Sequence, residues 1–152
     1  MNDEELLRYS RQIMLPDFDI AGQEALASSS VLILGLGGLG SPAALYLAAA
    51  GVGHLILVDH DHVDLSNLQR QIAHTTSNIG QEKATSAADR IQQINPSVKV
   101  TAHTMAFSEE TLDQLLEGVD VALDCTDNYQ EALYLQREYS IAFDKAIEIV
   151  KV

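Results

Sequence analysis

Glycines and charged side chains of the types that bind a nucleotide gather at three points of this sequence. The first cluster, residues 35–41, reads Gly-Leu-Gly-Gly-Leu-Gly-Ser and directly follows the apolar run 31–34. A helical pattern begins at Ser41, so the glycines lie between a strand and a helix, where such turns cradle phosphate at a helix N-terminus. The pattern predicts a nucleotide-phosphate site without specifying the nucleotide. A glycine-rich turn that binds nothing is the alternative.

Each glycine of this turn has its own expected role. Gly35 should allow the chain to bend sharply at the strand end, and Gly40 should allow the helix to pack closely on the sheet. Gly37 or Gly38 should let a phosphate approach bare backbone. Ser41-Pro42 supplies an expected N-cap followed by proline at the first helical position.

The second cluster, Asp59-His60-Asp61-His62, ends another apolar run at residues 54–58. A carboxylate at a strand end can accept hydrogen bonds from ribose hydroxyls, which fits NAD and ATP equally well, or it can cap a turn. Consecutive residues of an extended chain point to opposite faces, so at most alternate members should converge on a metal ion. We expect His60 and His62 to lie in a solvated loop.

Polar residues of the long connection after this cluster could bind a triphosphate. Arg70 and Lys83 are of the types that neutralise phosphate charge, and Asn67 can hold a phosphoryl oxygen or orient a neighbour. Arg70 could equally be an ordinary surface side chain. Lys83 lies near an expected helix start, where a cation is disfavoured by the helix dipole, so an anion is expected beside it.

The third cluster, Cys125-Thr126-Asp127-Asn128, follows a fourth apolar run. Asp127 could hold Mg²⁺, which proteins bind through one or two carboxylates plus substrate phosphates; an Asp–Asn turn is the alternative. Cys125 is expected to be a small buried residue and not a nucleophile.

Arg8 and Arg11 precede the glycine turn and could be surface residues or could reach a phosphate of either subunit.

Strands and helices alternate in the pattern that places these clusters together. Strands are predicted at 31–34, 54–59, 98–102, 119–124 and 147–152, and helices at 3–14, 19–27, 41–50, 81–94 and 108–118. A further apolar helical face is formed by Leu135, Tyr139, Ala142, Phe143 and Ala146. This alternation predicts a Rossmann-like, doubly wound, mostly parallel α/β sheet. The polar clusters follow strands, so they should meet at the carboxyl edge of the sheet.

Composition bounds the class of protein. The chain has 152 residues, 47% of them hydrophobic, which is enough for one globular domain. We divide it into a helical arm at 1–29, a core at 30–128 and a helix plus strand at 129–152. The net charge of −13 disfavours nucleic acid as a partner. No membrane span or signal peptide is expected, which favours the cytoplasm.

Several motifs together resemble one known family. In order, they are Arg8-Tyr9-Ser10-Arg11-Gln12, Gly35 to Ser41, Asp59-His60-Asp61, Ser66-Asn67-Leu68-Gln69-Arg70-Gln71, Lys83 and Cys125-Thr126-Asp127-Asn128. Over about residues 5–128 they resemble the MoeB/ThiF/HesA group, related to the ubiquitin-activating enzymes. The resemblance implies ATP- and Mg²⁺-dependent adenylation of the C-terminal glycine of a small β-grasp sulfur carrier ending in Gly-Gly, as in molybdopterin or thiamin biosynthesis.

The resemblance also implies a role for each matching residue. The nucleotide would be bound by Gly35, Gly37, Gly38, Gly40, Asp59, Asp61, Asn67, Arg70 and Lys83. Asp127 would hold Mg²⁺ and, with Arg70, Lys83 and Arg11, would form the catalytic set. Arg11 resembles an arginine that reaches into the ATP site of a second subunit, which implies a homodimer.

The match departs from the family pattern after Asn128. Ala132 stands where the family usually has an arginine, and the sequence contains a single cysteine, so no zinc site is expected in this chain. We expect a short version of the fold that lacks the family's C-terminal half. An ATP-binding half-domain that acts with a partner is therefore the alternative function. An NAD-dependent oxidoreductase is a more distant one, because it leaves Lys83 and Asp127 unexplained.

Overall fold

The computed structural model describes residues 1–106, 108–127 and 148–151. These ranges form a parallel sheet of five strands in the order β3-β2-β1-β4-β5. The strands are β1 (Ser30–Leu34), β2 (His54–Val58), β3 (Lys99–His103), β4 (Val121–Asp124) and β5 (Glu148–Lys151). The strand order reverses on either side of β1, as in a doubly wound sheet, so the Rossmann-like α/β fold expected from the sequence is confirmed.

Helices occupy most of the connections between strands. They are α1 (Asp3–Arg8), α2 (Ser10–Ile13), α3 (Asp19–Ser28), α4 (Gly40–Ala50), α5 (Lys83–Ile94) and α6 (Glu109–Leu115), with short 3-10 helices η1 (Leu65–Asn67) and η2 (Thr76–Asn78). The longest of them, α5, has 12 residues, whereas a spanning helix needs about 20 apolar residues. Within the described ranges, therefore, no helix could cross a membrane.

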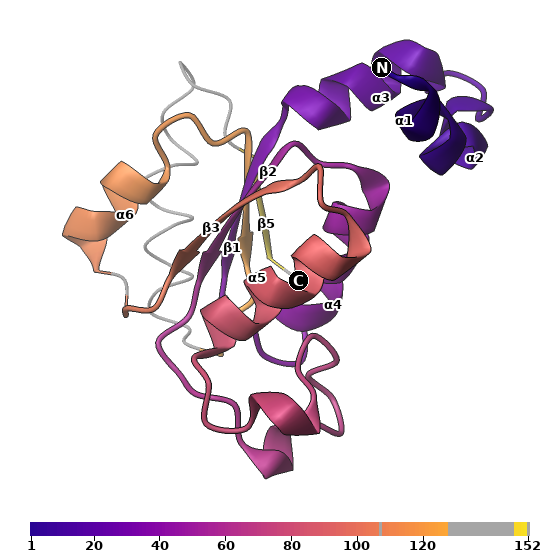
Figure 1. The fold of residues 1–152 in the computed structure, drawn as a ribbon. Coiled ribbons are helices and arrows are strands. Elements are labelled where there is room, and N and C mark those ends of the chain that lie inside the picture. Colours follow the sequence, from indigo (N-terminus) through magenta and orange to yellow (C-terminus); the bar gives the residue numbers. More distant parts are fainter. Residues whose placement is uncertain (107, 128–147, 152) are drawn as a thin grey trace.

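The core lies on both faces of the sheet because side chains alternate along each strand. Val31 and Ile33 of β1 pack with the small residues of α4 and with α5. Leu32 and Leu34 pack on the other face with α6. Figure 1 shows α4 and α5 covering one face of the sheet and α6 the other. Fully burying one such side chain stabilises the fold by about 2 kcal/mol, so both layers hold β1 and the turn that follows it.

Element boundaries agree with the sequence-based expectations to within a few residues. β3 begins at Lys99 rather than 98, β4 at Val121 rather than 119, and α6 ends at Leu115 rather than 118. The last expected strand, 147–152, is present as β5, parallel to β4. The expected apolar helix face at 135–146, and Ala132, lie outside the described residues.

The expected single helix at 3–14 is wrong, because the chain breaks at Tyr9. This residue leaves helical geometry, with φ −99° and ψ 9°, between α1 and α2. The break turns the ring inward, where it is buried and its hydroxyl accepts a hydrogen bond from Asn95 at 2.8 Å. A Cβ on Gly51 would lie 2.6 Å from this ring, so glycine is required there by packing as well as by its φ of +91°.

The expected N-cap at Ser41 is also wrong. α4 begins at Gly40, its N-cap is Leu39, and no side chain caps it. The Ser41 hydroxyl instead donates to the Leu36 carbonyl at 2.8 Å. The serine is thus fully buried inside the first turn of α4, and it ties that helix back to the glycine turn.

The long connection between β2 and α5 is an ordered loop that folds back on itself. The amide of Val63 donates to Gln81, and the amide of Gly80 donates to Val63. Capping boxes open both η1 and η2 within it. The connection therefore lies fixed at the carboxyl end of the strands, at the bottom of Figure 1.

Candidate functional site

A pocket of about 630 Å³ lies at the carboxyl edge of the sheet, within the size range of small-molecule sites. Its walls come from the glycine turn, the end of β2, the long connection, the start of α5 and the segments after β3 and β4. The lining residues are Gly35, Gly37, Gly38, Leu39, Val58, Asp59, His60, Asp61, Asn67, Arg70, Gln71, Lys83, Met105, Ala106, Cys125, Thr126 and Asp127.

Most of the residues that the sequence singled out line this one pocket. They are Gly35, Gly37, Gly38, Asp59, Asp61, Asn67, Arg70, Lys83 and Asp127. Gly40 lies behind the turn, and Arg11 is exposed on α2. Figure 1 shows α2 at the amino-terminal end of the sheet, whereas the pocket residues lie at the carboxyl edge. Arg11 is therefore not brought to the pocket of its own chain.

The glycines of the turn fall into two pairs. Gly35 has a φ of +83°, and a Cβ on Gly40 would lie 1.8 Å from the Gly35 carbonyl oxygen, so the fold itself requires both. A Cβ on Gly37 or Gly38 would meet only ordinary contacts at 3.6 Å, from Gln71 and Arg70. These two glycines leave open backbone facing the pocket.

Asp59 is buried at the end of β2 and organises two stretches of backbone. Its Oδ2 accepts from the Leu36 amide at 2.7 Å and its Oδ1 from the Asp61 amide at 2.8 Å. The turn-capping role that the sequence left open is thus present. Each carboxylate oxygen keeps a second lone pair that could accept from a ligand hydroxyl.

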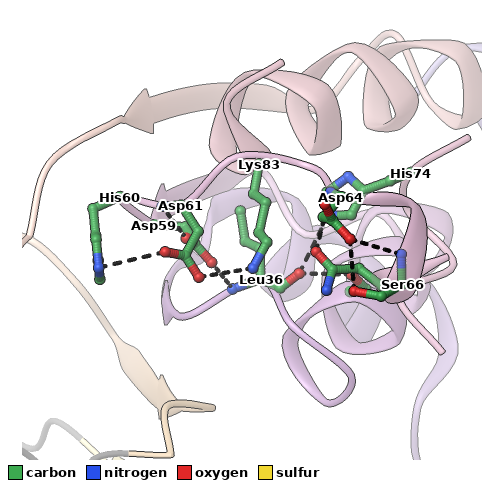
Figure 2. A network of polar contacts seen from close by, with 10 residues as sticks. Leu36, Asp59, His60, Asp61, Asp64, Ser66, His74 and Lys83 are labelled. Atoms are coloured by element: carbon green, nitrogen blue, oxygen red, sulfur yellow. Dashed lines mark hydrogen bonds and ion pairs between the residues drawn. The ribbon is translucent and has the colours of Figure 1, made fainter. Parts of the chain in front are cut away.

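Lys83 is the first residue of α5 and is 93% buried as a side chain, being 7% exposed. Its Nζ donates to Asp61 Oδ2 at 2.9 Å, as Figure 2 shows. This hydrogen bond is the main reason that the pKa of Asp61 is lowered. The anion expected beside this helix-start lysine is therefore a carboxylate of the chain itself, and it keeps the ammonium beside the pocket.

Asn67, the last residue of the 3-10 turn η1, and Arg70, three residues later, border the pocket. The Asn67 Oδ1 accepts from the Asp64 amide at 3.2 Å, and Arg70 Nη1 donates to the Ser66 carbonyl at 3.1 Å. The aliphatic stem of Arg70 lies over Gly38. One hydrogen bond uses a small part of the guanidinium, so donors remain for a phosphate.

The histidines after β2 are exposed, as expected. The expectation that only alternate members of this cluster could converge is wrong, because ligand atoms of Asp59, His60 and Asp61 all lie within 4.8 Å of one another. The reason is that the chain turns here rather than continuing extended, since Asp59 caps the Asp61 amide. Exposed acidic groups often gather in this way without a metal.

The segment after β4 contains a buried thiol followed by an exposed carboxylate. Burial raises the pKa of Cys125 to about 11, with a further contribution from Asp124. The thiol is thus protonated near neutral pH and is a poor nucleophile, as expected. Asp127 is exposed at the pocket, where a carboxylate could coordinate a cation shared with a ligand phosphate.

Two buried polar side chains of the connection were not singled out from the sequence. Gln71 lines the pocket, is 4% exposed, and its Oε1 has no hydrogen-bond partner among the described residues. His74 is buried under the glycine turn. Gln71 directly follows Arg70 in the motif, which was a usable signal, whereas an isolated histidine offered none.

Comparison with known proteins identifies the family of this chain. The ThiF family profile matches residues 9–150. The chain belongs to the ThiF family. This ThiF-family chain is 53% identical over 128 residues to the sulfur carrier protein ThiS adenylyltransferase of Escherichia coli K12, covering 84% of this chain and 51% of that protein. It is 52% identical to the molybdopterin-synthase adenylyltransferase of the same organism, with the same coverage. The chain thus spans about half the length of these curated relatives.

Solved structures resemble the ThiF-family chain over nearly its whole length. The E. coli tRNA N6-threonylcarbamoyladenosine dehydratase TcdA, in complex with ATP, superposes with a TM-score of 0.86 at 30% identity. That match covers 99% of this chain and 60% of TcdA. PaaA matches with a TM-score of 0.87 at 33% identity, covering 99% of this chain and 48% of PaaA.

Proposed function

We propose that the chain binds ATP in this pocket and adenylates the C-terminal glycine of a small β-grasp sulfur-carrier protein. One observation carries the proposal: Lys83, Arg70 and Asp127 line the same pocket as the open glycine backbone. Over 128 residues the chain is 53% identical to the ThiS adenylyltransferase and 52% identical to the molybdopterin-synthase adenylyltransferase. The structurally similar TcdA, which was solved in complex with ATP, supports the choice of ATP as the nucleotide.

The reaction requires several negative charges to approach one another. The carrier carboxylate attacks the α-phosphorus, a new P–O bond forms, the bond to the bridging oxygen breaks, and pyrophosphate leaves with the electron pair. Catalysis of this kind rests on positioning and charge neutralisation. Lys83 and Arg70 supply positive charge at the triphosphate, and Asn67 orients it.

The remaining pocket residues position the nucleotide and a metal ion. Gly37 and Gly38 admit the phosphates to the backbone, and Asp59 accepts from the ribose hydroxyls while it holds the turn. The exposed carboxylate of Asp127, in a pocket that also contains cationic side chains, suits Mg²⁺ shared with a phosphate. When bound, Mg²⁺ would supply further neutralisation of the triphosphate charge. When the nucleotide binds, the Lys83 ammonium exchanges its hydrogen bond to Asp61 for one to the triphosphate.

A homodimer is part of this proposal. Arg11 lies at the far end of its own chain's sheet, so it would serve the pocket of a second subunit. The arm around it exposes large apolar side chains, with Leu7 78%, Met14 76% and Leu15 55% exposed. Exposed apolar side chains on this arm suit a surface that a partner covers.

An exchange assay tests the proposed activity. Labelled pyrophosphate should enter ATP only when a β-grasp protein ending in Gly-Gly is present, and Asp127→Asn should lower the rate about 100-fold or more. Asp89→Asn, the same chemical change at an exposed position outside the pocket lining and the arm, should leave the rate unchanged. ATP binding without carrier-dependent exchange would instead favour the half-domain that acts with a partner, since the chain spans only half of its relatives. Binding of reduced nicotinamide without ATP binding would overturn both.

A further inference from the structure

The backbone of Leu36, between Gly35 and Gly37, is held by side chains from three other parts of the chain. Its amide donates to Asp59 Oδ2 at 2.7 Å. Its carbonyl accepts from Ser41 Oγ at 2.8 Å and contacts His74 Nε2 at 3.3 Å. Figure 2 shows Leu36 joined to Asp59 and His74 in this network. A turn rich in glycine loses much conformational entropy when it is ordered, so these contacts stabilise one conformation of it.

His74 connects the glycine turn to the helix that carries Lys83. The imidazole is buried, and its Nδ1 lies 2.9 Å from the Ser86 hydroxyl of α5. Ser86 is three residues after Lys83, on the same face of the helix. One ring therefore spans the distance between two walls of the pocket, the Gly37–Gly38 backbone and the start of α5.

The hydrogen-bond network assigns the tautomer of this ring. A carbonyl oxygen can only accept, so Nε2 carries the proton that is shared with Leu36, and Nδ1 accepts from the Ser86 hydroxyl. The pKa of His74 is lowered, mainly by burial and also by the nearby charge of Lys83. The Leu36 carbonyl and Asp59 act in the opposite direction. The ring is thus neutral near pH 7, as this tautomer requires.

We propose that His74 is a positioning residue for the nucleotide site: its Nε2–H holds the Leu36 carbonyl, while its Nδ1 holds Ser86 and with it the turn of α5 that carries Lys83. His74, which does not itself line the pocket, thereby helps to set the spacing between the open glycine backbone and the Lys83 ammonium, alongside the link that runs from the Leu36 amide through Asp59 and Asp61 to Lys83. This inference rests on the proposed function only in identifying the ligand as a nucleotide. The contacts of His74 with Leu36 and Ser86 are present in the protein without a ligand.

Two substitutions separate positioning from simple core filling. In His74→Gln the side-chain amide can reach the place of Nε2 and donate to Leu36, whereas in His74→Asn the shorter amide reaches only the place of Nδ1. Both variants are neutral and polar, and both remove the ring. If His74 only fills the core, the two should behave alike.

The test compares the wild type, both His74 variants and Ser86→Ala by ATP titration, by amide hydrogen exchange of residues 36–40 and by urea unfolding. His74→Asn should weaken ATP binding about tenfold, because small displacements of binding groups are costly, and should speed exchange in the turn by a similar factor. His74→Gln keeps the Leu36 contact and loses the Ser86 contact, so it should stay within about threefold of the wild type in both measurements. Ser86→Ala loses the same contact and should lie in the same range.

Specific outcomes would overturn the proposal. Equal ATP affinity and equal turn exchange in His74→Gln and His74→Asn would do so, as would effects that merely follow a shared loss of stability. If the wild type binds no ATP, the proposed function fails, yet the hydrogen-exchange comparison of the two variants still decides whether His74 positions the turn.

Discussion

At the scale of single residues, the pairing of Lys83 with Asp61 is the most informative contact of the pocket. A buried ammonium needs a partner, and here the partner carboxylate is itself 57% exposed. An ion pair with so exposed a partner is screened by solvent and contributes little stability, about 1 kcal/mol or less. A triphosphate entering the pocket could therefore replace Asp61 at Lys83 at little cost.

We expect Lys83→Met to weaken ATP binding about 10- to 100-fold and AMP binding much less, because the charge that it removes acts on the phosphates. Lys99→Met, at an exposed lysine of the edge strand β3, provides the matched control and should change neither affinity. Competitive titration with the two nucleotides measures both. An equal loss of ATP and AMP affinity in Lys83→Met would show that the lysine acts through the fold and not on the triphosphate.

At the scale of elements, the glycine turn must both pack tightly against itself and leave backbone open to a phosphate. A substitution at Gly40 tests the first requirement, and one at Gly38 tests the second. Gly40→Ala should destabilise the protein by about 3 kcal/mol, because its Cβ would meet the Gly35 carbonyl oxygen at 1.8 Å. Gly38→Ala should change stability by less than about 1 kcal/mol, since its nearest contact is ordinary, yet it should weaken nucleotide binding. Urea unfolding and ATP titration of both variants check this. A Gly38→Ala variant with unaltered ATP affinity would argue against phosphate at this backbone.

At the scale of the whole molecule, the two ends of the sheet differ in what they expose. The pocket lies at the carboxyl end, whereas α1 to α3 lie at the amino end, as Figure 1 shows. Hydrogen bonds from Gln12 and Gln23 to the Ala50 carbonyl fix this arm to the end of α4. Arg11 is thus held away from its own pocket, so any role in ATP chemistry requires a second copy of the chain.

Mixing two inactive variants tests that arrangement. Arg11→Ala and Asp127→Asn should each lose carrier-dependent pyrophosphate exchange when assayed alone. If Arg11 serves the partner's pocket, mixed dimers contain one intact site, and an equal mixture should recover about a quarter of the wild-type rate. Sedimentation should show a dimer. No recovery in a mixture that demonstrably exchanges subunits, or a strict monomer, would contradict the proposed role of Arg11.

The sequence alone predicts those features that depend on neighbouring residues. The apolar run at 31–34, the glycines after it and the helix to residue 50 form a strand, turn and helix because propensity and glycine chemistry act locally. The placement of polar residues after each strand also predicts a shared pocket, since parallel strands end at one edge. The predicted helix at Tyr9 was wrong because a contact with the distant Asn95 outweighed the local preference for helix. The predicted cap at Ser41 was wrong because its hydroxyl donates to the carbonyl of Leu36, five residues earlier, instead of capping the helix.

What the sequence could not reveal is which side chains hold the pocket in shape. Lys83 meets Asp61 across 22 positions, and His74 meets Leu36 across 38. No local pattern encodes such pairs, because they exist only once the connection has folded back beneath the glycine turn. The residue types for nucleotide chemistry can thus be read from the sequence itself. The pairing of Lys83 with Asp61 and the contact of His74 with the Leu36 carbonyl result from packing between segments that are distant along the chain.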